Sequence, residues 1–98
     1  KTKDVAMIYT ENRIVYVADA SGKKYFGEKN MAEMEAVLDG RFFFRMNRQY
    51  LVNINFIKAF RSFEKVKLLV ELEVPGIKKE IVISQENAPS FRQWIYYA

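Results

Sequence analysis

The sequence predicts a mainly β domain, built from antiparallel β-sheets and two short helices. Along residues 65–74, strongly apolar side chains recur at every second position, a pattern typical of a long half-buried strand. Pro75-Gly76 then predicts a turn, and residues 79–84 are expected to return as the antiparallel partner. The two helices are predicted near residues 30–38 and from residue 88 onward, where apolar side chains have helical spacing.

The first part of the chain predicts a hairpin, a short strand and a helix. Residues 5–10 and 14–17 are strand-like and flank the polar tripeptide Glu11-Asn12-Arg13, which we expect to be the turn of a hairpin. Residues 19–22 have turn composition, and residues 24–26 predict a third strand. Asn30 and Glu33 have the spacing of a capping box at a helix N-terminus. We expect the helix to end at Gly40 and to bury Met31, Met34 and Leu38.

The middle and the end of the chain are less regular. Residues 42–46 predict an aromatic strand, residues 47–55 a tight turn, and residues 56–60 a further extended segment. Pro89 would interrupt a helix begun at Ser84, so we expect a turn at residues 85–87 and a helix from Ala88. The inward face of that helix would carry Phe91, Trp94 and Ile95. No linker or repeat divides the chain, which indicates one domain over residues 1–98.

The composition excludes most catalytic and metal-binding classes. The 98 residues include no Cys and no His, which excludes disulfides, thiolate nucleophiles, Cys-based zinc sites and the commonest general base. Glu71 and Glu73 share one face of a predicted strand, but we expect both to face water beside Lys67. The longest uncharged stretch is nine residues, far short of a membrane span. We therefore expect no enzyme, no catalytic residue, no metal, no cofactor and no membrane segment, and a cytoplasmic location.

The basic residues are unevenly distributed along the chain. The net charge is +4, yet residues 41–61 hold five basic side chains and no acidic one. Four of these five are Arg, whose planar guanidinium suits phosphate and guanine, and they are interleaved with aromatic residues. This segment favours a polyanion as partner, whereas the alternative is a solvated charged face.

One run of residues resembles a family signature. Residues 43–53 read Phe-Phe-Arg-Met-Asn-Arg-Gln-Tyr-Leu-Val-Asn, with Ile57 four residues on. This run closely resembles the F-x-R-x-x-R-S-Y-x-V-N-x-x-x-I signature of the LytTR DNA-binding domain of bacterial response regulators. Residues 83–85 correspond to the V-S-R that the family has ahead of its last helix. The resemblance covers nearly all of the chain and implies a LytTR-like fold.

The resemblance also implies a function in DNA binding and transcription regulation. In this family, loops at one edge of the sheets enter successive major grooves of double-stranded DNA, and pairs of domains bind imperfect direct repeats as a dimer on DNA. The positions implied here are Asn12, Arg13, Asn47, Arg48, Gln49, Gln85 and Asn87. The resemblance further implies an N-terminal receiver domain of a two-component system. Because the chain begins with Lys1 and not Met, we expect it to be the C-terminal fragment of a longer regulator.

Some of these positions can also be interpreted from their chemistry. Arg48 is the best candidate for base recognition, because its guanidinium matches guanine O6 and N7; the alternative is a surface ion pair. Arg13, at a hairpin tip, could contact a base or a phosphate, or remain a solvated loop residue. Tyr50 and Asn53 are expected to be structural, as a core aromatic and a turn-stabilising amide. Further phosphate contacts are expected from Arg45, Lys58 and Arg61.

Three positions depart from the family pattern. Asn47 stands where the family often has His, Gln49 where it has Ser, and Gln85 where it has Arg or Lys. The amide of Gln85 is better suited to an adenine edge than to a phosphate, so either the preferred sequence differs or that loop contributes less. A second function stays open at this point: a small β-rich protein-interaction module that binds an acidic partner through the same basic segment.

Overall fold

A computed structural model describes residues 4–97; residues 1–3 and 98 of the expected domain lie outside this range. It contains two antiparallel sheets and two α-helices, which confirms the predicted fold class. The strands are β1 (Val5–Glu11), β2 (Ile14–Asp19), β3 (Lys24–Phe26), β4 (Phe43–Arg45), β5 (Tyr50–Asn53), β6 (Ile57–Phe63), β7 (Lys67–Val74) and β8 (Ile77–Ile83). The helices are α1 (Met31–Val37), the 3-10 helix η2 (Ile54–Phe56) and α2 (Ala88–Tyr97).

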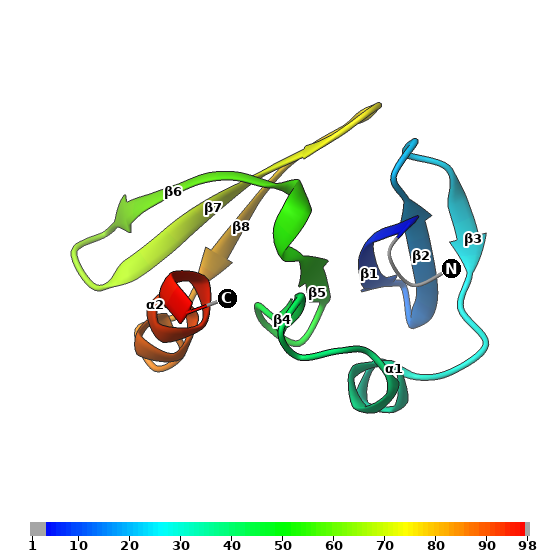
Figure 1. Cartoon of the computed structure of the whole chain (residues 1–98), viewed down its shortest axis with the longest axis horizontal. Coiled ribbons are helices and arrows are strands. Elements are labelled where there is room, and N and C mark those ends of the chain that lie inside the picture. The colour runs from blue at the N-terminus through cyan, green and yellow to red at the C-terminus, as the bar shows by residue number, and fades with distance from the viewer. Residues whose placement is uncertain (1–3, 98) are drawn as a thin grey trace.

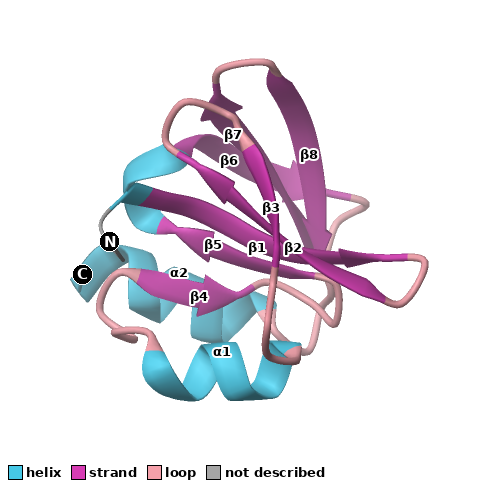
Figure 2. Ribbon diagram, turned by 90° about the vertical axis from the view of Figure 1, so that its right-hand side faces the viewer, coloured by secondary structure: helices cyan, strands magenta, loops and turns pink. Residues whose placement is uncertain are grey.

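The strands form two separate layers (Figure 1 and Figure 2). Sheet A has five strands in the order β3-β2-β1-β5-β4, and sheet B has three in the order β6-β7-β8. The predicted N-terminal hairpin is β1–β2, and the predicted C-terminal hairpin is β7–β8. The chain therefore completes the first sheet before it begins the second, and η2 makes the connection.

The main core lies between the two sheets and α2. Phe91 of α2 is fully buried and packs edge-on against Phe44 of sheet A and Phe60 of sheet B, with ring centroids 5.6 and 5.2 Å apart. Trp94 and Ile95 are partly buried against the same core, so the predicted inward face of this helix is confirmed. Pro89 is the second residue of α2, where its missing N–H removes no intrahelical hydrogen bond.

A second, smaller core lies on the opposite face of sheet A, under α1. Met31 of α1 packs with Ile8, Phe43 and Leu51 of three different strands. The predicted capping box is present: Asn30 Oδ1 accepts from the N–H of Glu33 at 2.8 Å, and the N–H of Asn30 donates to Glu33 Oε1 at 3.0 Å. These two bonds satisfy amide groups that the first helical turn leaves unpaired.

The predicted end of this first helix is wrong. The helix stops at Val37, and Leu38 already has an extended backbone, with its N–H donating to Met34 O. Asp39 then turns the chain, because its carbonyl accepts from the N–H groups of residues 42 and 43. Gly40 does not cap the helix; instead its carbonyl accepts a hydrogen bond of 2.9 Å from the Trp94 indole.

The prediction of a turn throughout residues 47–55 is also wrong. Residues 50–53 form β5, which lies between β1 and β4 in sheet A. Leu51 and Val52 point to opposite faces of the sheet and are both buried, Val52 in the main core and Leu51 in the smaller core under α1. Such a strand shows no alternation of polar and apolar residues, so the period-two signal that marks a half-buried strand is missing.

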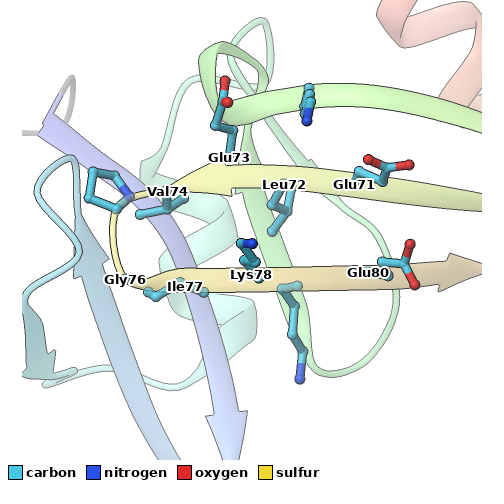
Figure 3. A pocket seen from close by; sticks show the side chains of 11 residues that line it. Glu71, Leu72, Glu73, Val74, Gly76, Ile77, Lys78 and Glu80 are labelled. Carbon is cyan, nitrogen blue, oxygen red and sulfur yellow. The ribbon is translucent and has the colours of Figure 1, made fainter.

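The alternation predicted for β7 is confirmed on its inner face. Leu68, Val70, Leu72 and Val74 are buried there, and Figure 3 shows Leu72 on the opposite side of the strand from Glu71 and Glu73. Leu69 departs from the pattern, since it is buried on the outer face between Arg61 and Val82 of the neighbouring strands. Val66 is 48% exposed and precedes the strand.

Candidate nucleic-acid interface

Three polar loops converge at one end of the molecule. The Asn12-Arg13 turn follows β1 and residues 47–49 precede β5, and because these strands are antiparallel the two segments lie at the same end of sheet A. The N–H of Thr10 donates to the carbonyl of Gln49 at 3.0 Å, which ties them together. Asn47 Nδ2 donates to the carbonyl of Val82 at 3.5 Å, and β8 leads directly into residues 84–87. We call these three segments the loop end.

The β1–β2 turn places two residues in an uncommon backbone conformation. Asn12 and Arg13 have φ values of 52° and 68°, and Glu11 pairs directly with Ile14, so the turn is a two-residue hairpin connection. The left-handed conformation costs an ordinary residue roughly 1–2 kcal/mol. Both side chains are exposed, and the hairpin extends well to the right in Figure 2.

The loop of residues 47–49 is shaped by Asn47. Its Oδ1 accepts from the N–H groups of Gln49 and Tyr50 at 2.8 and 3.1 Å, while the N–H of Met46 donates to the carbonyl of Tyr50 at 2.8 Å. Asn47 therefore closes the loop and is only partly exposed, whereas Arg48 and Gln49 are exposed. The site contains a loop-forming amide followed by two side chains that are available to a ligand.

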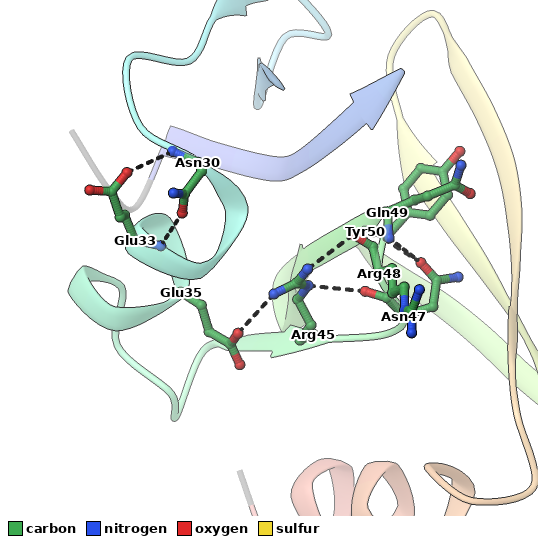
Figure 4. A network of polar contacts seen from close by, with 8 residues as sticks. All are labelled: Asn30, Glu33, Glu35, Arg45, Asn47, Arg48, Gln49 and Tyr50. Atoms are coloured by element: carbon green, nitrogen blue, oxygen red, sulfur yellow. Dashed lines mark hydrogen bonds and ion pairs between the residues drawn. The ribbon is translucent and has the colours of Figure 1, made fainter. Parts of the chain in front are cut away.

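The Arg45 guanidinium fixes this loop by hydrogen bonds to its backbone carbonyls (Figure 4). Its Nε donates to the carbonyl of Asn47 and its Nη2 to the carbonyl of Arg48, both at 3.0 Å. Its Nη1 lies 3.1 Å from Glu35 Oε1 on α1. Three of its five N–H donors are thus used within the domain, and its side chain is 28% exposed. The structure gives Arg45 the role of a positioning residue.

The third loop is a tight turn at the start of α2. The N–H groups of Asn87 and Ala88 both donate to the carbonyl of Ser84, which confirms the predicted turn. Gln85 and Asn87 are exposed, as is Glu86 between them. A carboxylate repels phosphate but accepts a hydrogen bond from the cytosine amino group, so this loop is suited to a base edge more than to the DNA backbone.

The acid-free stretch along the chain does not form an acid-free surface. Arg41 pairs with Asp39 at 2.8 Å, Arg45 with Glu35, and Arg61 with Glu71 at 2.9 Å and more distantly with Glu80. Between residues 4 and 97, Arg48 and Lys58 make no ion pair. Lys58 is the second residue of β6, whereas the loops lie near the other end of that strand, where Ser62 pairs with Leu68, so the structure does not bring Lys58 to the loops.

Sequence reasoning missed Lys65. It lies in the β6–β7 turn with a φ of 69° and an exposed side chain. Leu68 pairs with Ile83, so this turn and residues 84–87 leave adjacent strands at the same end of sheet B. The nearby carboxylate of Glu64 forms an ion pair with Lys67 and not with Lys65, since Glu64 Oε1 lies 3.2 Å from Lys67 Nζ. The signal was present in the polar dipeptide Glu64-Lys65 between two strands, the same pattern that marks Asn12-Arg13.

Two further properties concern the described residues as a set. No helix between residues 4 and 97 is long and apolar enough to cross a membrane. Nor do three or more Asp or Glu side chains of that range gather in a way that could hold a metal ion.

This two-sheet domain presents polar and cationic side chains on three loops at one end, an arrangement that suits a protein that binds a polyanion such as a nucleic acid. A family model for the LytTr DNA-binding domain matches residues 1–96, so the chain belongs to the LytTR family and functions in DNA binding and transcription regulation. This confirms the resemblance seen in the sequence. It also confirms that the domain is not an enzyme, because the family is a DNA-binding one.

A solved structure supports the same assignment of the fold. The chain is similar to the LytTr DNA-binding domain of a Bacillus cereus protein described as a methyl-accepting/DNA response regulator. The TM-score is 0.81 at 22% sequence identity, and the match covers 96% of this chain and 83% of the other. No curated protein matches the chain.

Proposed function

We propose that the domain binds double-stranded DNA sequence-specifically by inserting the loop end into the major groove. The observation that carries this proposal is the convergence of exposed Arg13, Arg48, Gln49, Gln85 and Asn87 from three separate loops. Each of these side chains can make paired or single hydrogen bonds to base edges. The loops are held by hydrogen bonds within the domain, so little conformational freedom is lost on binding.

Each loop has a distinct role in this proposal. Arg48 binds guanine O6 and N7, because its guanidinium is exposed and makes no ion pair within residues 4–97. Arg13 contacts a base or the flanking phosphate, and the amides of Gln49 and Gln85 bind adenine edges. Asn47 and Arg45 position the central loop, and Lys65 adds a phosphate contact at the edge of the site.

In its biological setting, the domain is proposed to be the output half of a cytoplasmic two-component response regulator. A receiver domain would precede it, and two copies would bind paired direct repeats. On direct repeats the two copies have the same orientation along the duplex, so each presents its loop end to its own repeat in the same way. Arg61, which is already ion-paired, would contribute at most a weak phosphate contact.

The first test is the Arg48→Ala variant on a duplex selected from a random pool. Loss of a bidentate guanine contact is expected to weaken specific binding by about 1–3 kcal/mol, with a smaller effect on random duplex. Fluorescence anisotropy titrations on both duplexes give the two affinities. The control is Arg41→Ala, since Arg41 is paired with Asp39 outside the loops and should leave both affinities unchanged.

If Arg48→Ala lost the same binding free energy on the selected and the random duplex, Arg48 would contact a phosphate and not a base. A domain that bound no duplex at low salt, yet captured an acidic protein, would support the protein-interaction function instead. The ion pairs of Arg41, Arg45 and Arg61 argue against that second function, because they occupy three of the five cations of the segment through which an acidic partner was expected to bind.

A further inference from the structure

A cleft of about 340 Å³ runs between the two sheets, from Glu11 and Tyr50 beside the loop end to Gly22 and Gly76. Its walls come from β1 and β5 of sheet A and from the β7–β8 hairpin of sheet B. One end is closed where the β2–β3 turn meets that hairpin, so tightly that a Cβ on Gly22 would overlap the Pro75 carbonyl oxygen. The volume is that of a small-molecule site at the low end of the usual range.

Tyr9 and Tyr50 line the sheet A wall of this cleft, and Tyr16 stacks beside them outside its lining. Tyr9 stacks on Tyr16 and on Tyr50, with ring centroids 5.4 and 6.1 Å apart. Two lysines from different sheets lie over these rings: Lys24 Nζ is 5.1 Å from the centre of the Tyr16 ring, and Lys79 Nζ is 5.1 Å from the centre of the Tyr50 ring. The ring faces attract both ammonium groups and hold them toward the cleft.

Neither ammonium group has a carboxylate partner among residues 4–97. The ion pairs of that range involve other cations, and Glu11, which also lines the cleft, is within ion-pair distance of neither. Lys79 is half-buried. The Tyr9 hydroxyl, with a weaker effect from Glu11, raises the pKa of Lys24, so this side chain stays charged. Two ammonium groups that line one cleft and make no ion pair within residues 4–97 are suited to bind an anion there.

We propose that this cleft binds a phosphate-type anion between Lys24 and Lys79. The anion can come from a free small molecule or from the backbone of bound DNA, since both present the same oxygens. Tyr50 directly follows the Gln49 of the loop end, and Glu11 directly precedes Asn12, so an occupied cleft abuts two of the three loops. The proposed phosphate site does not depend on whether those loops recognise bases.

The test is a titration of the DNA-free domain with inorganic phosphate, followed by amide chemical shifts in ¹⁵N-labelled protein. Saturable shifts are expected around Tyr9, Lys24, Tyr50 and Lys79. Loss of one charged contact in Lys79→Gln should weaken phosphate binding about tenfold. Lys24→Gln, at an exposed position, should do the same without risk to the core, whereas the exposed Lys29→Gln on another part of the surface should have no effect.

The Glu11→Gln variant is expected to change the affinity for phosphate in the opposite direction. Removal of this carboxylate from the cleft should strengthen phosphate binding, which a merely damaged fold cannot imitate. Shifts that stay linear and spread over all lysines, or equal effects of Lys79→Gln and Lys29→Gln, would overturn the proposal.

A second titration in the presence of the selected duplex identifies the source of the anion. If the DNA backbone occupies the cleft, the duplex displaces phosphate, and Lys24→Gln reduces the salt dependence of DNA binding. If a free molecule occupies it, phosphate stays bound beside DNA and that salt dependence is unchanged. Failure of the DNA-free titration would leave the DNA-binding proposal intact, because the Arg48 variant tests that proposal separately.

Discussion

Arg13 occupies a backbone conformation that stability alone would not select. At the second position of a two-residue hairpin turn with both φ values positive, glycine avoids the clash between the side chain and the backbone. Asparagine followed by glycine would therefore be the preferred dipeptide for this turn. An exposed arginine held there at a φ of 68° is consistent with selection for what its side chain binds.

Arg13→Gly should separate stability from function. Relief of the left-handed strain is expected to raise the free energy of unfolding by about 1 kcal/mol, while loss of the guanidinium weakens DNA binding. Urea unfolding and anisotropy titration on the same preparation measure the two effects. Arg13→Ala is the control, because it removes the same contact and retains the strain. Equal DNA affinity in wild type and both variants would exclude Arg13 from the interface.

At the same scale, the sequence predicted which residues share a loop better than what each side chain does in that loop. The signature placed Asn47, Arg48 and Gln49 in one loop, and the structure agrees. It did not distinguish Asn47 and Arg45, whose polar groups build the loop, from Arg48, whose guanidinium faces outward. Hydrogen bonds between residues two or three apart depend on the local backbone path, which residue types alone do not specify. Asn53 was predicted as structural, and this is confirmed: it is buried and caps η2.

Among the elements, most predictions rested on the exposure of one face to water. Strands β7 and β8 and both helices have one face in solvent, which produces a period in the sequence. Strand β1 is buried from Ala6 to Tyr9 and was predicted instead from its apolar run and the polar turn that follows it. Strand β5 was missed because it is buried on both faces and only four residues long. The pairing that makes it a strand comes from β1, which is distant in the chain, and such a partner leaves no local signal.

The contact between the β2–β3 turn and the β7–β8 hairpin is expected to be sensitive to a single methyl group. Gly22→Ala places a Cβ against the Pro75 carbonyl at a φ of +88°, and should cost about 2–4 kcal/mol of unfolding free energy. Gly76→Ala has the same kind of φ but open space, and should cost only about 1–2 kcal/mol. Urea unfolding of both variants makes the comparison. Equal losses would show that the two turns are not in close contact in solution.

The β2–β3 turn is also expected to make stability depend on pH. Asp19 accepts from the Ser21 hydroxyl, its main stabilising partner, and from the N–H of Lys23 and the Tyr25 hydroxyl, which lowers its pKa from 3.8 to about 2. Because the pKa is lower in the folded state, ionised Asp19 stabilises the fold above about pH 4, and this contribution disappears as the pH falls toward 2. Urea midpoints across that range should fall more for wild type than for Asp19→Asn. Parallel curves would contradict this assignment.

For the whole molecule, the cations available to a polyanion depend on the distribution of charge more than on the net charge. The net charge of +4 includes arginines that are paired with acids ten residues away in the sequence, namely Arg45 with Glu35 and Arg61 with Glu71. A segment count cannot detect these pairs, because folding creates them. Among the exposed cations of residues 4–97 that make no ion pair, Arg13, Arg48 and Lys65 lie at turns and loops of the same end.

The salt dependence of DNA binding should report this distribution. Each phosphate contact that is neutralised contributes about 0.9 to the slope of log K against log salt, so Lys65→Gln should lower the slope by about that amount. Arg61→Ala should change it much less, because Arg61 is already paired with Glu71. Affinities measured at several salt concentrations give the slopes. A larger change for Arg61→Ala than for Lys65→Gln would place the DNA on the outer face of sheet B.

The hydrogen bond from Asn47 to the Val82 carbonyl joins a loop of one sheet to the last strand of the other. The distance between residues 47–49 and residues 84–87 therefore depends on the side chains that fill the hydrophobic core between the sheets. If the loops bind base edges as proposed, exchange of the exposed residues at their tips would change which bases are preferred. The interval between the contacted bases would then be set by buried residues such as Met46 and Phe91, which fill the space between the sheets. Side chains that look purely structural in this sequence would thereby also fix a length along the duplex.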